Sequence, residues 1–215
     1  MSTLTINAIA SKSGAPVNFP NGLTIGEGGK FGNINFIGLA GQQGFGVGIC
    51  PAIPSGMAKM AGTDDIASDN YGNYQFTDGS IMVWMPAFYY KYGTGANGLS
   101  INDVDIKGFY DYENVAAANA AGYALHRAFY NGGAIQQGVF VDKYLCSDNG
   151  GVASSIKLGN PLSSSATHNG FSLVGAANFC YGAIDAVKTR GSDFFCNTQF
   201  IFKALALLSL AHGQA

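Results

Sequence analysis

The stretch GSIMVWMPAFYYKYG, residues 79–93, decides how this chain is expected to fold. Apolar residues occupy both faces of its first half, with Val83 and Met85 on one face and Trp84 on the other. Such a pattern is typical of a β-strand that other parts of the protein cover on both sides. Pro86 interrupts it, although a proline in a central strand removes one ladder hydrogen bond. The fold must therefore accommodate a two-sided strand that contains a proline.

The composition favours a β-rich, loop-rich protein. The chain has 215 residues, enough for one large domain or two small ones, and its 47% of hydrophobic residues can form a sizeable core. Only 11% of the residues are charged and 31 are glycine, a mixture that suits a protein outside cells or on a particle. The net charge of −2 provides no basic surface for nucleic acid, so we expect no such partner.

Neither a secretory signal nor a membrane span is expected. The N-terminal sequence MSTLTINAIASKSG lacks a basic start followed by an apolar core. The most apolar run, FIFKALALLSLA at residues 200–211, contains Lys203 and is too short to cross a bilayer, so it predicts a buried helix. An extracellular type of composition without a signal indicates assembly in a cytoplasm and release by lysis.

Residues that could carry catalysis or bind metal are few. The histidines have no spacing that suggests a shared metal site; they are His126, His168 and His212. The cysteines form no C-x-x-C pair and are expected to be small buried thiols, with a disulfide left open; they are Cys50, Cys146, Cys180 and Cys196. No G-x-S-x-G, H-E-x-x-H or P-loop motif is present. We therefore expect no enzyme activity, no cofactor, no metal and no catalytic residue.

Three zones follow one another along the chain. Residues 1–50 alternate short β-like runs with glycine turns, which bury little within one chain and would pair better across a subunit interface. Residues 51–112 contain a polar loop and the opening strand. Residues 113–215 are expected to form helices with a strand between them. This order predicts an α+β protein that assembles into an oligomer.

The polar loop at residues 62–80 is rich in aspartate. A calcium loop is one interpretation, but the spacing does not match D-x-[DN]-x-[DN]-G, so solvated turn carboxylates are expected. The aspartates are Asp64, Asp65, Asp69 and Asp78.

A helix is expected in NVAAANAAGYALHRAFYNGG, residues 114–133. Asn114 is its expected N-cap and Gly132-Gly133 its stop. Apolar residues recur at spacings of three and four along it: Val115, Ala118, Gly122, Leu125 and Phe129. Another side of the helix carries Tyr123, His126 and Tyr130, which are expected to be solvated rather than to line a binding surface.

The next elements are a strand and two helices. In QGVFVDKYLCSDNGG, residues 137–151, apolar residues again alternate onto both faces, and Asp142 and Lys143 would point to opposite faces, each with a partner or a route to solvent. A helix with an apolar stripe from Leu173 to Val187 is expected to end at Gly191. A last helix should start near Asn197 or Thr198, and its apolar residues go nearly all round, which predicts a central place in a core.

Two of these segments resemble the signatures of one family. MVWMPAFYYKYG (82–93) resembles the M-V-x-I-P-x-G-x-F-x-M-G strand of the formylglycine-generating-enzyme-like group, and GVFVDKYLCS (138–147) resembles its F-x-I-D-x-Y-E-V-T strand. The two helices that follow occupy the places of its A-x-x-Y-C-x-W and L-P-T-E-A-E-W-E-Y-A-A helices. This group has the C-type-lectin fold, which implies about three helices against a small mixed or antiparallel sheet. It also implies that the first strand bends at Pro86 and continues through the tyrosines.

The sequence departs from the family signatures at several places, and these departures decide which properties of the family are expected here. Leu145-Cys146-Ser147 replaces E-V-T, and Asn197-Thr198-Gln199 replaces the capping turn P-T-E. The second half of the family, with its ligand loops and catalytic cysteines, has no counterpart in this sequence. The sequence therefore indicates a shortened lectin-like domain or a fragment, and no catalytic residue of the family is assigned here.

The N-terminal segment is similar to the start of bacteriophage tail-fibre proteins. The residues that carry this likeness are STLTINAIASKSGAPVNFPNGLTIG, which in such proteins lead a trimeric β-rich shaft. The likeness implies that residues 1–50 attach to the virion and trimerise, and that residues 51–215 form a lectin-like head. The expected partners are two further copies of the chain, other phage tail proteins and a glycan or pilus on the bacterial surface.

The expected function is a tail-fibre or tail-tip protein that binds a bacterial receptor without covalent chemistry. Aromatic side chains would offer platforms for sugar rings, and three heads on one stalk would multiply a weak affinity. Tyr71 and Tyr74 are candidates for such platforms, although packing in a core or turn is the stronger interpretation, and the receptor site stays unassigned. The alternatives are a structural tail or baseplate component and a glycan-cleaving tailspike, whose paired carboxylates no spacing would reveal.

Overall fold

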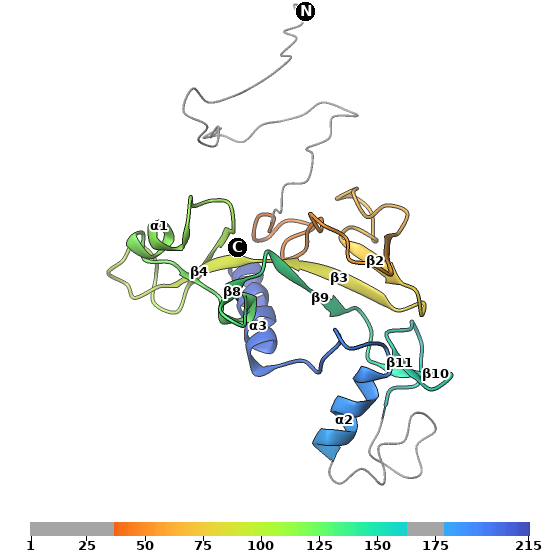
Figure 1. Ribbon diagram of the computed structural model, residues 1–215. Helices are drawn as coiled ribbons and strands as arrows, with labels where there is room; N and C mark the ends of the chain where they lie inside the picture. The colour runs from red at the N-terminus through yellow and green to blue at the C-terminus, as the bar shows by residue number, and fades with distance from the viewer. Residues whose placement is uncertain (1–36, 163–178) are drawn as a thin grey trace, which may run out of the picture. The chain divides into compact units, whose positions relative to one another are not determined.

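The computed structural model describes residues 37–162 and 179–215. All of these residues belong to one compact unit. The attachment role expected for residues 1–50 therefore falls mostly on residues outside the described part. In the described part the chain has mixed α and β structure with antiparallel sheets and three α-helices, which confirms the α+β class (Figure 1).

The central sheet has four antiparallel strands in the order β1-β2-β3-β9. Their bounds are β1 Met57–Lys59, β2 Asn73–Phe76, β3 Ile81–Pro86 and β9 Gly138–Asp142. In the pairing of β3 with β9, Trp84 lies opposite Phe140 and Met82 opposite Asp142. The prediction that the two signature segments belong to one sheet is therefore confirmed.

Strand β3 is covered on both faces, as its sequence pattern predicts. Met85 is 2% exposed and packs into the larger hydrophobic cluster, while Trp84 is 7% exposed and packs with Cys50 and Tyr74 in a smaller one. A separate core on each side of this strand explains why neither face of the strand carries polar residues.

Pro86 marks the place where the chain leaves one sheet for another. It is the last residue of β3, where it lies opposite Gly138, and the backbone N–H of the next residue, Ala87, donates to Gln137 O at 2.8 Å. The chain then continues as β4, Phe88–Tyr92, in a three-stranded sheet of order β5-β4-β6. The outer strands of that sheet are β5 Val104–Gly108 and β6 Ala124–Leu125. The predicted bend after Pro86 is confirmed, since a proline at a strand end costs no central ladder bond.

The helix predicted over residues 114–133 is wrong beyond its first turns. α1 spans Val115–Ala120, and Asn114 caps it by accepting from Ala117 N at 2.9 Å, as expected. Gly122 then adopts a φ of +84°, which ends the helix. The remaining residues form β6, the 3₁₀ turn η1 Arg127–Phe129, and the hairpin of β7 Tyr130–Asn131 with β8 Ala134–Ile135.

The apolar residues of this segment are buried although most of them are not helical. Ala118 and Phe129 are fully buried and Leu125 is 6% exposed, because Leu125 pairs with Tyr89 of β4 and the Phe129 ring meets that of Phe88 edge-on. The helical spacing predicted the burial of Ala118, Leu125 and Phe129 correctly, but Val115 is half-buried and Gly122 is exposed. The helical backbone is wrong because tertiary pairing with β4 outweighs local helix propensity.

Strand β9 is shorter than predicted, because the chain turns at Lys143 and Leu145 is 75% exposed. A small antiparallel hairpin follows, made of β10 Ser147–Asn149 and β11 Val152–Ser154. α2, Phe179–Lys188, packs against β11 and ends before Gly191, as expected; the first part of its predicted stripe, from Leu173, lies outside the described residues.

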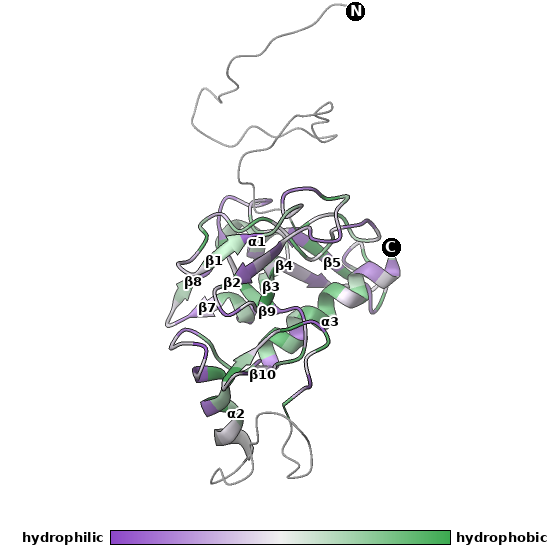
Figure 2. Cartoon of the chain, turned by 90° about the vertical axis from the view of Figure 1, so that its right-hand side faces the viewer, coloured by the Kyte–Doolittle hydropathy of each residue, from purple (hydrophilic) through white to green (hydrophobic). Residues whose placement is uncertain are grey.

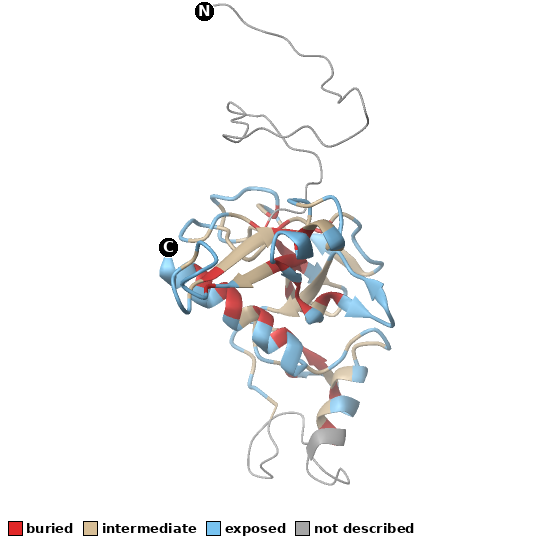
Figure 3. Cartoon of the chain, turned by 90° about the vertical axis from the view of Figure 1, so that its left-hand side faces the viewer, coloured by how far each residue is buried: buried red, intermediate tan, exposed pale blue. Residues whose placement is uncertain are grey.

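α3 spans Gln199–Gln214 and starts where the sequence predicts, because Thr198 caps it by accepting from Ile201 N. One side of the helix is buried: Ile201, Ala204, Leu207, Leu208 and Ala211. The prediction that the helix is covered nearly all round is wrong, since Phe202 is 60% and Leu210 52% exposed. Buried and exposed stretches alternate along it in Figure 3, and apolar colours prevail along its ribbon in Figure 2.

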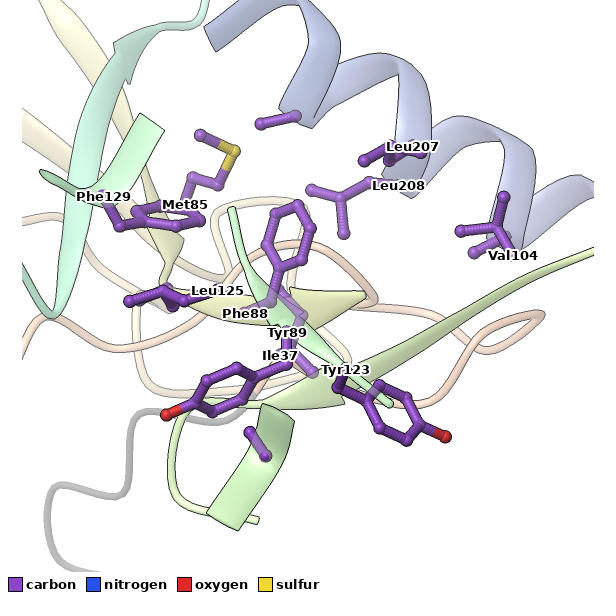
Figure 4. Packing of buried hydrophobic residues seen from close by; sticks show 14 of the residues in the cluster. Ile37, Met85, Phe88, Tyr89, Val104, Tyr123, Leu125, Phe129, Leu207 and Leu208 are labelled. Carbon is purple, nitrogen blue, oxygen red and sulfur yellow. The ribbon is translucent and has the colours of Figure 1, made fainter. Parts of the chain in front are cut away.

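The main core lies between α3 and the sheet of β4. Phe88 points from β4 toward Leu208 of α3, and Val104 of β5 lies beside Leu207 (Figure 4). The segment that precedes β1 closes the same core with Ile37, which is 4% exposed. It also contacts the end of α3, where Gly41 N donates to His212 Nδ1 at 3.2 Å. None of the described helices is long and apolar enough to cross a membrane.

Candidate functional site

The two tyrosines proposed as sugar platforms are not exposed. Tyr74 is completely buried, its hydroxyl accepts from Cys50 N at 2.8 Å, and burial raises its pKa to about 12. Its ring meets that of Phe140 edge-on, 5.2 Å between centroids. Tyr71 is half-buried near Ile66, against the backbone of Gly44. Core packing, the stronger interpretation from sequence, is confirmed for Tyr74.

Among the aspartates of the polar loop, Asp64 and Asp65 are exposed, as expected, whereas the Asp78 side chain is only 13% exposed and pairs with Arg190, so its expected solvation is wrong. Lys59 Nζ donates to Asp64 Oδ1 at 2.7 Å, and Asp65 accepts from Ala67 N at 3.0 Å. Within residues 37–162 and 179–215, no three His, Cys, Asp or Glu side chains gather as metal ligands would. The calcium interpretation of this loop thus gains no support.

A buried polar cluster surrounds Arg190, just after α2. Its guanidinium donates to Asp142 through Nη1 at 2.7 Å and Nη2 at 3.1 Å, and its Nε lies 3.4 Å from Asp78 Oδ2. Cys146 Sγ donates to Asp142 Oδ2 at 3.0 Å. Asp142 thus has the partner that the sequence requires, while Lys143 Nζ reaches Asp69 O at 3.3 Å. We refer to Arg190, Asp142, Asp78 and Cys146 as the Arg190 cluster.

The electrostatics of the Arg190 cluster suit a structural role. Burial, the hydrogen bond to Asp142 and its charge raise the pKa of the Cys146 thiol to about 12, so it is not a thiolate nucleophile. Burial alone would raise the pKa of Asp78, but hydrogen bonds from Ser154 and Ser80 and the charge of Arg190 hold it below its ordinary value. A sugar-cleaving acid needs the opposite shift. Cys50 and Cys146 are free thiols.

A shallow hollow of about 280 Å³ lies at the edge formed by β1 and β2. It is open to solvent and is lined by Gly56, Ala58, Gln75, Phe76, Thr77 and Gly79. Its lining offers one aromatic ring and no charged group, so it provides little to orient a ligand.

The residues expected on a solvated helix face are separated by the structure. His126 is 5% and Tyr123 7% exposed, so their expected solvation is wrong, while Tyr130 is 41% exposed. Tyr123 donates from its hydroxyl to Asp105, and Lys91 Nζ lies 4.5 Å above its ring. His126 instead stacks on Phe88, with 5.6 Å between ring centroids.

A row of rings runs along β4 on the side that faces α3. Residues alternate along a strand, so Tyr90 and Tyr92 share the side of Phe88. The rings of Tyr90 and Tyr92 lie 5.5 Å apart, and Tyr90 lies 5.5 Å from the ring of His126. Tyr92 is 53% exposed, Tyr90 is half-buried, and His126 lies beneath the surface.

Two cations lie near this row, one in η1 and one near the start of α3. Arg127 is exposed, and its guanidinium lies 5.9 Å from the centre of the Phe200 ring, which is 45% exposed. Lys203, exposed one turn further along α3, lies close enough to His126 to lower its pKa. We name the set Tyr90, Tyr92, Arg127, Phe200 and Lys203 the α3–β4 face.

His126 keeps its surroundings fixed without adding charge. Its Nδ1 accepts from Ala128 N at 3.2 Å, and burial, together with the charge of Lys203, lowers its pKa to about 4. At neutral pH the imidazole is therefore uncharged, and the positive charge of the α3–β4 face comes from Arg127 and Lys203.

Sequence reasoning did not find the α3–β4 face. The period-two spacing of Phe88, Tyr90 and Tyr92 shows that they share a side. Phe200 and Lys203, however, come near Arg127 and His126 only through the packing of a helix more than seventy residues further along the sequence. Comparison with known proteins adds no relative, because no family model, curated protein or solved structure matches this chain.

Proposed function

We propose that this chain is a tail-fibre or tail-tip protein of a tailed bacteriophage, and that its described unit is a receptor-binding head. The observation that carries the binding role is the α3–β4 face, where exposed aromatic rings and two cations stand on a strand, a helix and a turn. Regular elements hold side chains more rigidly than loops do, so little entropy is lost when a ligand binds.

A C-type-lectin-like head is the fold that supports this proposal. The two segments that resemble the family signatures pair through Met82–Pro86 and Gly138–Asp142, as β3 and β9 of one antiparallel sheet. The chain bends after Pro86, and two helices follow β9 along the chain. The N-terminal likeness to tail fibres supports the attachment of residues 1–50 to the virion and a trimer.

The proposed mechanism is reversible adhesion to a bacterial surface glycan or pilus. Tyr92 and Phe200 present flat, partly apolar rings, which stack on sugar rings at low entropic cost because few side-chain torsions are frozen. Three heads on one stalk would raise the avidity by about a hundredfold or more over one head. The protein would be assembled in the bacterial cytoplasm and act on the virion tail.

An adsorption experiment tests this function. The purified full chain, at saturating concentration, should coat host cells and block adsorption of the phage that encodes it. The Tyr92→Ala variant should block much less well, whereas Tyr110→Ala, which removes a ring that is 49% exposed outside the α3–β4 face, should act as wild type. Failure of the wild-type chain to adhere at saturation would overturn the adhesin.

One observation favours a second role, that of a structural tail or baseplate component. On the outer side of α3, Phe202 and Leu210 are exposed with Ala206 between them at helical spacing. Exposed apolar residues in a row are typical of surfaces that pack against a neighbouring protein. Loss of virion assembly in Phe202→Ser phage, with adsorption intact in the particles that do form, would favour this role.

A further inference from the structure

We propose that the α3–β4 face binds a polysaccharide whose sugar rings carry carboxylate groups, such as a uronic-acid polymer of the bacterial surface. This inference rests on the proposed adhesin function and names its ligand class. It follows from the charge of the face, from the placement of its rings and from the way a uronate carries its charge.

The charge of the α3–β4 face is uniformly positive. Arg127 and Lys203 are both exposed, and none of the five residues that define the face is acidic. Asp105 of the neighbouring strand β5 lies opposite Lys91 rather than opposite Tyr90 or Tyr92. Its carboxylate accepts from Tyr123 and is 3.3 Å from Lys107. In a chain with a net charge of −2, two unpaired cations beside exposed rings complement an anionic ligand.

The chemistry of the two cations suits carboxylates. A guanidinium offers two parallel N–H donors that match the two oxygens of a carboxylate, whereas an ammonium acts as a point charge. The described structure shows neither an ion pair nor a hydrogen bond from Arg127 or Lys203 to an acidic side chain. Both groups are therefore available to a ligand.

The adjacency of rings and cations favours a uronate over a phosphate-linked polymer. In a uronate the carboxylate is attached to the sugar ring itself, so a ring that stacks on Phe200 carries its charge to the side. The Arg127 guanidinium lies over the Phe200 ring, 5.9 Å from its centre, where it can meet the carboxylate of a sugar bound at this ring, and Lys203 is one helical turn further along. Phosphate linkers hold their charge between the rings instead. The row from Tyr90 to Tyr92 would continue the platform for further sugars.

A binding assay with defined polymers tests this inference. Polygalacturonate, alginate and hyaluronan serve as uronate probes, and the methyl ester of polygalacturonate serves as a neutral match with the same backbone. We expect the full chain to bind at least one uronate polymer in calorimetry, and to bind it about tenfold more weakly at 0.5 M than at 0.05 M salt. Esterification should reduce affinity by about tenfold or more.

Variants locate the site. Arg127→Gln and Lys203→Gln should each weaken uronate binding about tenfold, and the matched control Lys188→Gln, which removes an exposed cation at the end of α2, should not. Binding to none of the three uronates would overturn the inference. The inference would also be overturned by equal binding to the ester, by tighter binding to a phosphate-linked teichoic polymer, or by unchanged binding of both variants.

The assay separates this inference from the adhesin on which it rests. If the chain coats host cells and blocks adsorption but shows none of the expected uronate behaviour, the ligand class is wrong and the adhesin stands. If the chain neither coats host cells nor binds the polymers, both are wrong.

Discussion

Arg190 and Asp142 form a two-point ion pair that joins the end of α2 to the end of β9, with N···O distances of 2.7 and 3.1 Å. The Arg190 side chain is only 3% exposed, and its Nε also donates to Ala153 O of β11 at 2.8 Å. Asp78, in the turn between β2 and β3, completes its surroundings. One guanidinium thus connects the central sheet, the β10-β11 hairpin and the end of α2.

Replacing Arg190 should destabilise the protein strongly. Arg190→Met removes the cation and leaves two carboxylates beside each other in a mostly buried place, which should cost about 3 kcal/mol of the free energy of unfolding. Urea unfolding followed by the fluorescence of the single tryptophan, Trp84, measures this. Lys107→Met is the matched control, because its pair with Asp105 is 40% and 28% exposed and should contribute less than about 1 kcal/mol. Equal losses in the two variants would contradict the assigned role.

Gly138 should not tolerate a side chain. It lies opposite Pro86 in the β3–β9 pairing, where an added Cβ would meet the Trp84 ring and lie 2.6 Å from the Met85 carbonyl oxygen. Gly138→Ala should therefore cost about 2 kcal/mol, because a well-packed core relaxes only partly around extra atoms. Gly213→Ala in α3 has open space around its Cβ and should be neutral or stabilising by up to about 1 kcal/mol. A neutral Gly138→Ala would disprove the close packing at the kink.

His126 should make stability depend on pH. Its pKa is lowered by burial and by Lys203 to about 4 in the folded protein, from 6.5 in an exposed chain. The unfolded chain therefore binds the proton more tightly, so stability is full above pH 6.5 and falls as the pH drops toward 4. Between pH 7 and 5 the loss should be about 2 kcal/mol. His126→Gln keeps an acceptor for Ala128 N and should be less dependent on pH; an equal slope in this variant would contradict the assignment.

The sequence predicted the strands of the head better than its helices. The two-sided pattern around Trp84, the kink at Pro86 and the caps at Asn114 and Thr198 are local signals, and the structure confirms them. The helix expected beyond Ala120 fails because pairing with β4 decides the backbone. Its spacing of three and four identified Leu125 and Phe129 as buried but missed Tyr123 and His126. Local pattern and tertiary contact then give different answers.

The candidate site could not be predicted from local sequence patterns, because its residues meet only through tertiary contacts. Asp142 could be recognised as needing a partner, because a charge in a two-sided strand is costly when alone. That the partner is Arg190 depends on how α2 returns to the sheet, which no spacing encodes. The same is true of Lys203, which comes near His126 and its neighbour Tyr90 only through the packing of α3. For Tyr74, core packing was the stronger interpretation from sequence, and its ring fills the smaller core.

The Cys146 thiol should be unreactive in the folded protein. Burial, its hydrogen bond to Asp142 and the charge of that carboxylate raise its pKa to about 12, and only the thiolate attacks alkylating reagents. A variant in which Cys50, Cys180 and Cys196 are serine isolates this thiol. At pH 8 it should react with iodoacetamide at least about tenfold more slowly when folded than in urea. Arg190→Met, added to this variant, should leave the folded rate low, because the carboxylate that raises the pKa stays in place. Rapid alkylation of the folded parent variant would show that Asp142 and Arg190 hold a thiolate, and would reopen a chemical role for the cluster.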